Sequence, residues 1–133
     1  MRILLAEDER DLSRALSAIL SKNNYSVDAV YNGEDAISYI ESGVYDCVIL
    51  DVMMPKIDGI TVLKNIRSKN INIPIIILTA KTEIEELKTQ VSKEIKNAKN
   101  NTFDDISIII TFISSMLFYK KDLKRALKFI KAN

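Results

Sequence analysis

Three acidic residues in two short segments have the side chains needed for metal-dependent phosphoryl chemistry. Glu7 and Asp8 follow one short apolar run, and Asp51 follows another at residues 46–50. Clustered carboxylates repel one another strongly at low dielectric, so such clusters persist where a hard cation neutralises them. Mg²⁺ takes oxygen ligands and keeps several waters, which suits one or two carboxylates and a phosphate. An aspartate carboxylate is also a known covalent phosphoryl acceptor.

A hydroxyl group stands in a corresponding place after a third apolar run. Thr79 directly follows residues 74–78 and can donate a hydrogen bond to a phosphate oxygen. Each of these residues has an ordinary structural explanation when taken alone. Acids at 7–9 favour the start of a helix, Asp51 can cap a turn, and Thr79 can cap a helix. Their shared position at the ends of separate apolar runs favours a common site.

The apolar runs alternate with helical patterns, which predicts a parallel sheet. Four segments have the length of short strands: apolar runs at residues 2–6, 46–50 and 74–78, and an alternating segment at residues 25–30. Regular alternation of strand and helix implies an α/β fold, a doubly wound sheet with helices on both faces. Ligands of such sheets bind at the carboxyl ends of the strands, near the topological switch point. The four residues named above are therefore expected at one sheet edge.

The C-terminal third fits this alternation less clearly. Residues 82–95 begin with a capping-box pattern and continue with helical spacing, and residues 123–131 predict a last helix. Residues 106–113 are rich in β-branched side chains, which favours a fifth strand. The alternative is one long helix from Asp104 onward, because the apolar residues there also fit helical spacing.

Length and composition are those of one ordinary globular domain. The chain has 133 residues, 47% of them hydrophobic and 28% charged, so we expect a single domain over residues 1–133. A net charge of +1 gives no reason to expect direct nucleic-acid binding. The most apolar stretch, residues 106–119, is short for a span of ~20 residues, so no membrane segment is expected. The single cysteine, Cys47, fits a reducing compartment, and a cytoplasmic location is expected.

Three segments resemble the receiver domain of two-component response regulators. They are Ile3–Glu9, Val48–Gly59 and Pro74–Ala80. The middle segment is the most specific, and the resemblance covers residues 1 to about 86. It implies a flavodoxin-like (βα)5 fold, in which the fifth strand and the last helix of this chain are atypical.

The resemblance also implies a role for each candidate residue. Asp51 would be the phosphoacceptor, and Thr79 would be the switch hydroxyl that moves toward the phosphoryl group. Mg²⁺, or Mn²⁺ in its place, would be bound directly by Asp8 and Asp51 and by the backbone carbonyl of Met53. Glu7 would act through a metal-bound water.

A sensor histidine kinase is the partner that the resemblance implies. Leu12 and Ala15 lie where family members present an apolar patch to the kinase, although ordinary core packing explains them equally well. Pro55 and Gly59 would shape the loop around the site. No conventional enzyme activity is expected beyond self-phosphorylation from a phosphodonor and autodephosphorylation.

One family feature, a lysine–proline pair at the end of the fifth strand, is absent. The chain has two prolines, Pro55 and Pro74, and neither follows a lysine. By spacing, the pair would fall near residues 101–103, or at residues 114–115 if the β-branched segment is the strand. Three other lysines are candidates to replace the missing one: Lys56, Lys81 and Lys99. Losing a charge at a phosphoryl-transfer site commonly costs a few kcal/mol of transition-state stabilisation.

Three functional hypotheses follow. The first is a phosphorylated receiver, and the second is a pseudo-receiver binding module that is incompetent for phosphorylation. The third is an engineered or recombined chimera without a native function, with a junction near residues 82–88 and a foreign segment over residues 87–133. The Lys-, Asn- and Ile-rich composition of that segment motivates the third hypothesis.

Overall fold

The alternation of strands and helices predicted from the sequence is present in the structure. The computed structural model describes residues 1–80 and 108–112. Its elements are β1 (Arg2–Ala6), α1 (Arg10–Lys22), β2 (Ser26–Val30), α2 (Gly33–Glu41), β3 (Cys47–Asp51), α3 (Gly59–Ser68), β4 (Ile75–Ala80) and β5 (Ile108–Phe112).

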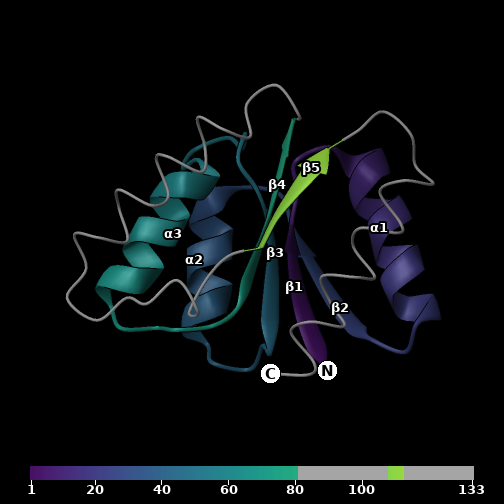
Figure 1. Cartoon of the computed structure of the whole chain (residues 1–133), viewed down its shortest axis with the longest axis horizontal. Coiled ribbons are helices and arrows are strands. Elements are labelled where there is room, and N and C mark those ends of the chain that lie inside the picture. The colour runs from purple at the N-terminus through teal and green to yellow at the C-terminus, as the bar shows by residue number, and fades with distance from the viewer. Residues whose placement is uncertain (81–107, 113–133) are drawn as a thin grey trace.

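The strands form one parallel sheet with the order β2-β1-β3-β4-β5. This is the flavodoxin-like order. The chain adds β2 on one side of β1 and then adds β3, β4 and β5 on the other side, so the topological switch point lies between β1 and β3. Helix α1 covers one face of the sheet, and α2 and α3 cover the other (Figure 1). The predicted α/β fold class is therefore confirmed, and the switch point lies where the acidic residues were expected.

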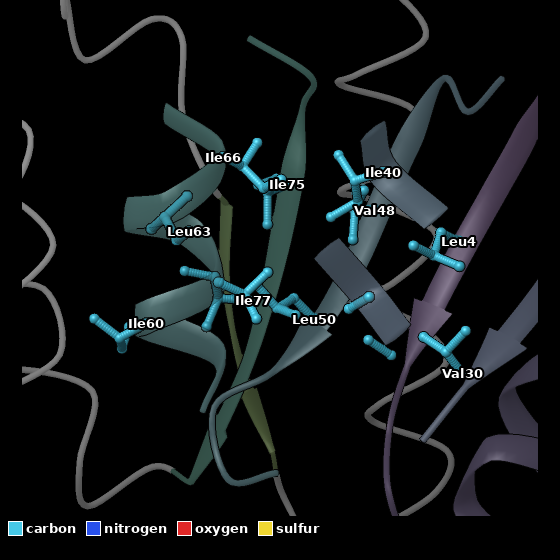
Figure 2. Close-up of a cluster of buried hydrophobic side chains, with 13 residues drawn as sticks. Leu4, Val30, Ile40, Val48, Leu50, Ile60, Leu63, Ile66, Ile75 and Ile77 are labelled. Carbon is cyan, nitrogen blue, oxygen red and sulfur yellow. The ribbon is translucent and has the colours of Figure 1, made fainter. Parts of the chain in front are cut away.

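The sheet separates two clusters of buried apolar side chains. Strand β3 contributes to both, because Val48 and Leu50 face the α2–α3 side while Cys47 and Ile49 face the α1 side. A central parallel strand is buried on both faces, which explains its unbroken apolar sequence. Figure 2 shows the α2–α3 cluster, where Leu63 and Ile66 of α3 lie over the sheet.

Side-chain caps fix the starts of α2 and α3 near the carboxyl edge of the sheet. Asn32 accepts a hydrogen bond from the Asp35 amide at 2.8 Å, and Asp58 accepts one from the Thr61 amide at 2.8 Å. Each cap satisfies an amide that the first helical turn leaves without a partner. Both helices therefore begin at defined positions beside the loops that follow β2 and β3.

Two strands extend further than their apolar runs predicted. Asp51 is the last residue of β3, and Thr79 lies inside β4; both were expected just beyond their strands. The backbone ladder continues through these polar residues, since Asp51 pairs with Leu78 and Ala80 pairs with Phe112. An apolar pattern marks what a sheet buries, whereas the ladder depends only on backbone groups.

The β-branched segment of the C-terminal third contains a strand. Strand β5 runs parallel to β4 over Ile108–Phe112, so the alternative of a helix there is wrong. The predicted helices over residues 82–95 and 123–131 lie outside the described residues. The predicted junction near residues 82–88 also lies outside them.

Candidate functional site

The carboxyl ends of two neighbouring strands bring three acidic side chains together. Ala6 at the end of β1 pairs with Leu50 of β3, so Glu7 and Asp8 emerge beside Asp51. One carboxylate oxygen of each acid lies within 4.8 Å of the others. The prediction that these residues converge is confirmed.

The three acids differ in their exposure to solvent. The side chain of Glu7 is buried, with 4% of its surface exposed, whereas Asp51 is partly buried and Asp8 is exposed. The site is thus open on the side of Asp8 and closed behind Glu7. An incoming group can therefore reach the cluster without unfolding the sheet edge.

Backbone amides hold two of the carboxylates in place. The Glu7 carboxylate accepts a hydrogen bond from the Glu9 amide at 3.2 Å, and the Asp51 carboxylate accepts one from the Met53 amide at 3.3 Å. The Glu7 amide itself donates to the Val30 carbonyl at 3.1 Å and continues the pairing of β1 with β2. The carboxylates are therefore oriented by the backbone of their own loops.

Burial is the main cause that raises the pKa values of both inner carboxyls, and a neighbouring acid adds to the shift of each. Burial raises the pKa of Glu7 to about 8, and the nearby charge of Asp51 adds to this effect. Burial also raises the pKa of Asp51 to about 6, although the hydrogen bond from Met53 opposes the shift. In the absence of a cation, the Glu7 carboxyl therefore keeps its proton to a higher pH than an exposed glutamate does.

This donor set fits a small divalent cation. Mg²⁺ and Mn²⁺ prefer oxygen ligands, and the three acids supply them from one side, leaving the exposed side for water or phosphate. A cation would also remove the repulsion that raises the two pKa values. The residues present thus match the chemistry of the expected metal.

Thr79 and Met53 lie near the cluster, but their expected roles stay predictions. Thr79 follows Leu78, the β4 partner of Asp51, which places the Thr79 backbone at the same sheet edge. The Met53 amide contacts Asp51, and its side chain is 71% exposed. The family resemblance implies a role for the Met53 carbonyl, whereas no sequence signal pointed to this amide donor.

The other residues predicted to take part are placed as follows. Leu12 is half-buried and packs against the α1-side cluster, and Ala15 of the same helix is also half-buried. The Lys56 ammonium lies 3.8 Å from a carboxylate oxygen of Glu34. Lys81 and Lys99 lie outside the described residues.

One contact beside the acidic segment was not predicted. The Arg10 guanidinium lies over the ring of Tyr31, 3.6 Å from its centroid, and joins the first residue of α1 to the residue that follows β2. The two residues are distant in the sequence and share no motif. No sequence signal pointed to this pair.

The family of the chain follows from comparison with known proteins. The model of the response regulator receiver domain matches residues 3–115. The chain belongs to this family. The receiver match extends past residue 86, where the resemblance of the three sequence segments ends.

Curated relatives of this receiver are regulatory proteins of greater length. The transcriptional regulatory protein DltR of Streptococcus agalactiae is 46% identical over 83 residues, covering 62% of this chain and 37% of DltR. The response regulator ArlR of Staphylococcus aureus is 43% identical over 82 residues, with 62% and 37% coverage. The chain therefore spans less than two fifths of the length of these relatives.

Solved receiver structures have the same fold. TrrA of Thermotoga maritima, solved in complex with Mg²⁺ and BeF, matches with a TM-score of 0.66 and 31% identity over 94% of this chain and 97% of TrrA. The receiver domain of the Francisella response regulator 1452 matches with a TM-score of 0.72 and 24% identity over 98% and 97% of the two chains.

No helix within residues 1–80 and 108–112 has the length and apolar character that crossing a membrane requires.

Proposed function

We propose that this receiver takes a phosphoryl group from a sensor histidine kinase onto Asp51, with Mg²⁺ bound directly by Asp8, Asp51 and the Met53 carbonyl and indirectly, through water, by Glu7. The observation that supports this proposal is the convergence of the three carboxylates within 4.8 Å at the carboxyl edge of the sheet. The Mg²⁺ and BeF complex of TrrA supports the same chemistry by similarity.

The transfer is a substitution at phosphorus. An Asp51 carboxylate oxygen attacks, a new O–P bond forms, and the P–N bond of the phosphohistidine breaks with its electron pair passing to the imidazole nitrogen. The metal, when bound, neutralises charge that develops on the phosphoryl oxygens. Water later attacks phosphorus, which releases phosphate and restores the carboxylate.

The chain's own residues orient the acceptor for this step. The Met53 amide holds one Asp51 oxygen through its hydrogen bond, leaving the other oxygen for attack. Asp8 is exposed and is proposed as the direct metal ligand, whereas buried Glu7 is proposed to act through metal-bound water. The Thr79 hydroxyl is proposed to bind a phosphoryl oxygen afterwards.

Incubation with Mg²⁺ and acetyl phosphate, followed by intact-mass measurement, tests the acceptor. We expect one added phosphoryl group in the native protein and none in Asp51→Asn. Asp46→Asn is a matched control, because Asp46 lies just before β3, at the opposite end of the strand from Asp51. An unmodified native protein, or modification of Asp51→Asn at the native level, would refute the proposal.

A metal titration of Asp8→Ala tests the ligand assignment separately. We expect the affinity for Mg²⁺ to fall by more than roughly tenfold, since even residues that only support metal ligands contribute this much. Native affinity in Asp8→Ala would show that Asp8 is not a ligand.

A pseudo-receiver that binds partners without phosphorylation is the second candidate. It is favoured by the sequence after β5, because residues 113–119 contain no lysine to pair with the acidic cluster. The acetyl phosphate experiment separates the two functions, since a pseudo-receiver stays unmodified at Asp51. We propose that the receiver controls transcription, because its relative DltR is a transcriptional regulatory protein. The receiver would exert this control through contacts with other proteins.

A further inference from the structure

The loop that follows the candidate phosphoacceptor rests on the first residue of α2. Gly33 is buried, and a Cβ atom there would lie 1.9 Å from the Ile57 carbonyl oxygen and 2.8 Å from the Ile57 Cβ. The Gly33 amide also donates a hydrogen bond to the Pro55 carbonyl at 3.4 Å. Only a residue without a side chain allows this approach, because the obstructing atoms are the Ile57 carbonyl group and the Ile57 Cβ, none of which can turn away without moving the backbone.

The same loop, residues 52–58, is held at its base by a second glycine. A Cβ at Gly59 would lie 2.2 Å from the Asp51 carbonyl oxygen, and the Gly59 amide donates to the Val52 carbonyl at 2.9 Å. Lys56 lies between Pro55 and Ile57, the two loop residues that contact Gly33. Its φ of 68° is in the left-handed region that residues with side chains rarely adopt. Such a conformation persists where the surroundings fix the backbone on both sides.

The position of this loop matters for the acidic cluster. Met53 lies inside it and donates its amide to the Asp51 carboxylate at 3.3 Å. The Met53 carbonyl is also the proposed third protein ligand of the metal. A displacement of the loop at Gly33 would therefore be transmitted, through a few backbone units, to both groups.

We propose that Gly33 is a positioning residue for the metal and phosphoryl site, acting through the loop of residues 52–58; this inference rests on the proposed function. Gly33 touches neither the metal nor the phosphoryl group. It sets how closely the loop approaches α2, and thereby where Met53 meets Asp51. Substitution of a residue that supports a metal ligand typically lowers metal affinity by about 10- to 100-fold.

A pair of glycine substitutions separates positioning from general destabilisation. Gly33→Ala places a methyl group against Ile57, whereas Gly43→Ala strains a backbone with a φ of 78° where nothing lies within 4 Å of the new Cβ. Mn²⁺ affinity and urea unfolding are measured for both variants and for the native protein. We expect Mn²⁺ affinity to fall by roughly tenfold or more in Gly33→Ala and to stay within about twofold in Gly43→Ala.

Equal Mn²⁺ affinities in folded Gly33→Ala and in the native protein would overturn the inference and leave the proposed function intact. An equal loss in both variants would overturn it as well, because the effect would then follow stability alone. Absence of Mn²⁺ binding by the native protein would overturn the proposed function and this inference together.

Hydrogen exchange in the native protein keeps the inference testable if Gly33→Ala does not fold. The Gly33 amide bonds to the loop, whereas the Ser42 amide bonds to Tyr39 at the far end of the same helix. We expect saturating Mg²⁺ to slow exchange at Gly33 and to leave Ser42 unchanged. Unchanged exchange at Gly33 while Mg²⁺ binds would overturn the inference.

Discussion

Glu7 is the residue at which burial and charge oppose each other most strongly in the described part of the chain. Its carboxyl has a pKa raised from 4.5 to about 8, mainly by burial and then by the charge of Asp51. A raised carboxyl pKa means that the folded state binds more protons than the unfolded state at intermediate pH. The cluster thus stabilises the metal-free fold when protonated and weakens it when ionised.

A pH dependence of stability follows. The protonated Glu7 carboxyl contributes fully to the free energy of unfolding below about pH 4.5, and this contribution is lost as the pH rises toward 8. Asp51, with its pKa raised to about 6, acts in the same direction. We expect the free energy of unfolding of the metal-free protein to fall by an amount on the order of a few kcal/mol over this interval, measured by urea denaturation at several pH values.

Glu7→Gln should make this pH dependence shallower, because the amide cannot ionise. Glu41→Gln is the matched control, since Glu41 is an exposed carboxylate at the end of α2 that pairs with Lys69. If the free energy of unfolding of Glu7→Gln depended on pH as steeply as that of the native protein, the Glu7 carboxyl would not be the cause of the pH dependence.

The sequence was sufficient to predict the convergence of these acids, because parallel strands end at a common edge. It was not sufficient for the hydrogen bond from Met53 to Asp51 or for the contact of Arg10 with Tyr31. Such contacts depend on loop conformations and on pairs distant in sequence. Neither leaves a periodic pattern in the chain.

At the level of elements, α3 depends on a side-chain cap at the end of the loop of residues 52–58. Asp58 accepts the Thr61 amide at 2.8 Å, and no other acid lies in the first turn of the helix. Its charge therefore also provides the favourable interaction with the helix dipole.

Asp58→Ala should lower the free energy of unfolding by roughly 0.5–2 kcal/mol, because the Thr61 amide loses its partner. Urea denaturation measures the change. Asp58→Asn should stay close to the native value, since asparagine caps helices about as well as aspartate. A loss in Asp58→Asn equal to that in Asp58→Ala would contradict capping as the cause.

The elements were predictable where apolar spacing was clear, and their ends were less so. Strand β3 includes Asp51 and β4 includes Thr79, because the hydrogen-bonded ladder continues after the apolar run stops. Strand β5 falls inside the predicted segment of residues 106–113, but composition alone left a helix open there. Pairing with β4 decides between the two, and a single sequence does not record pairing.

For the molecule as a whole, the sheet acts as a partition between two apolar layers. The clusters on its two faces are formed by different side chains, as the alternation along β3 illustrates. Residues that share no neighbours contribute independently to stability, whereas residues in one layer couple through packing. Stability should thus be additive across the sheet.

A double-mutant cycle tests this expectation. Ile66 and Ile3 are both fully buried and lie in different clusters, so Ile66→Val and Ile3→Val should each cost about 0.5–1.5 kcal/mol and add within about 0.5 kcal/mol. Ile66→Val with Ile77→Val is the comparison within one cluster. Coupling across the sheet above that limit in urea denaturation would show that the layers are not independent.

The first residues of the chain lie at the edge of the sheet opposite to the acids (Figure 1). The Met1 carbonyl accepts the Ser26 amide at 3.1 Å, and the Arg2 amide donates to Asp46 at 2.7 Å, so this end is fixed in the sheet. A fluorophore or surface tether joined ahead of Met1 would emerge on the far side from Asp51. Protein immobilised in this orientation would leave the sheet edge that carries the acidic cluster facing the solution.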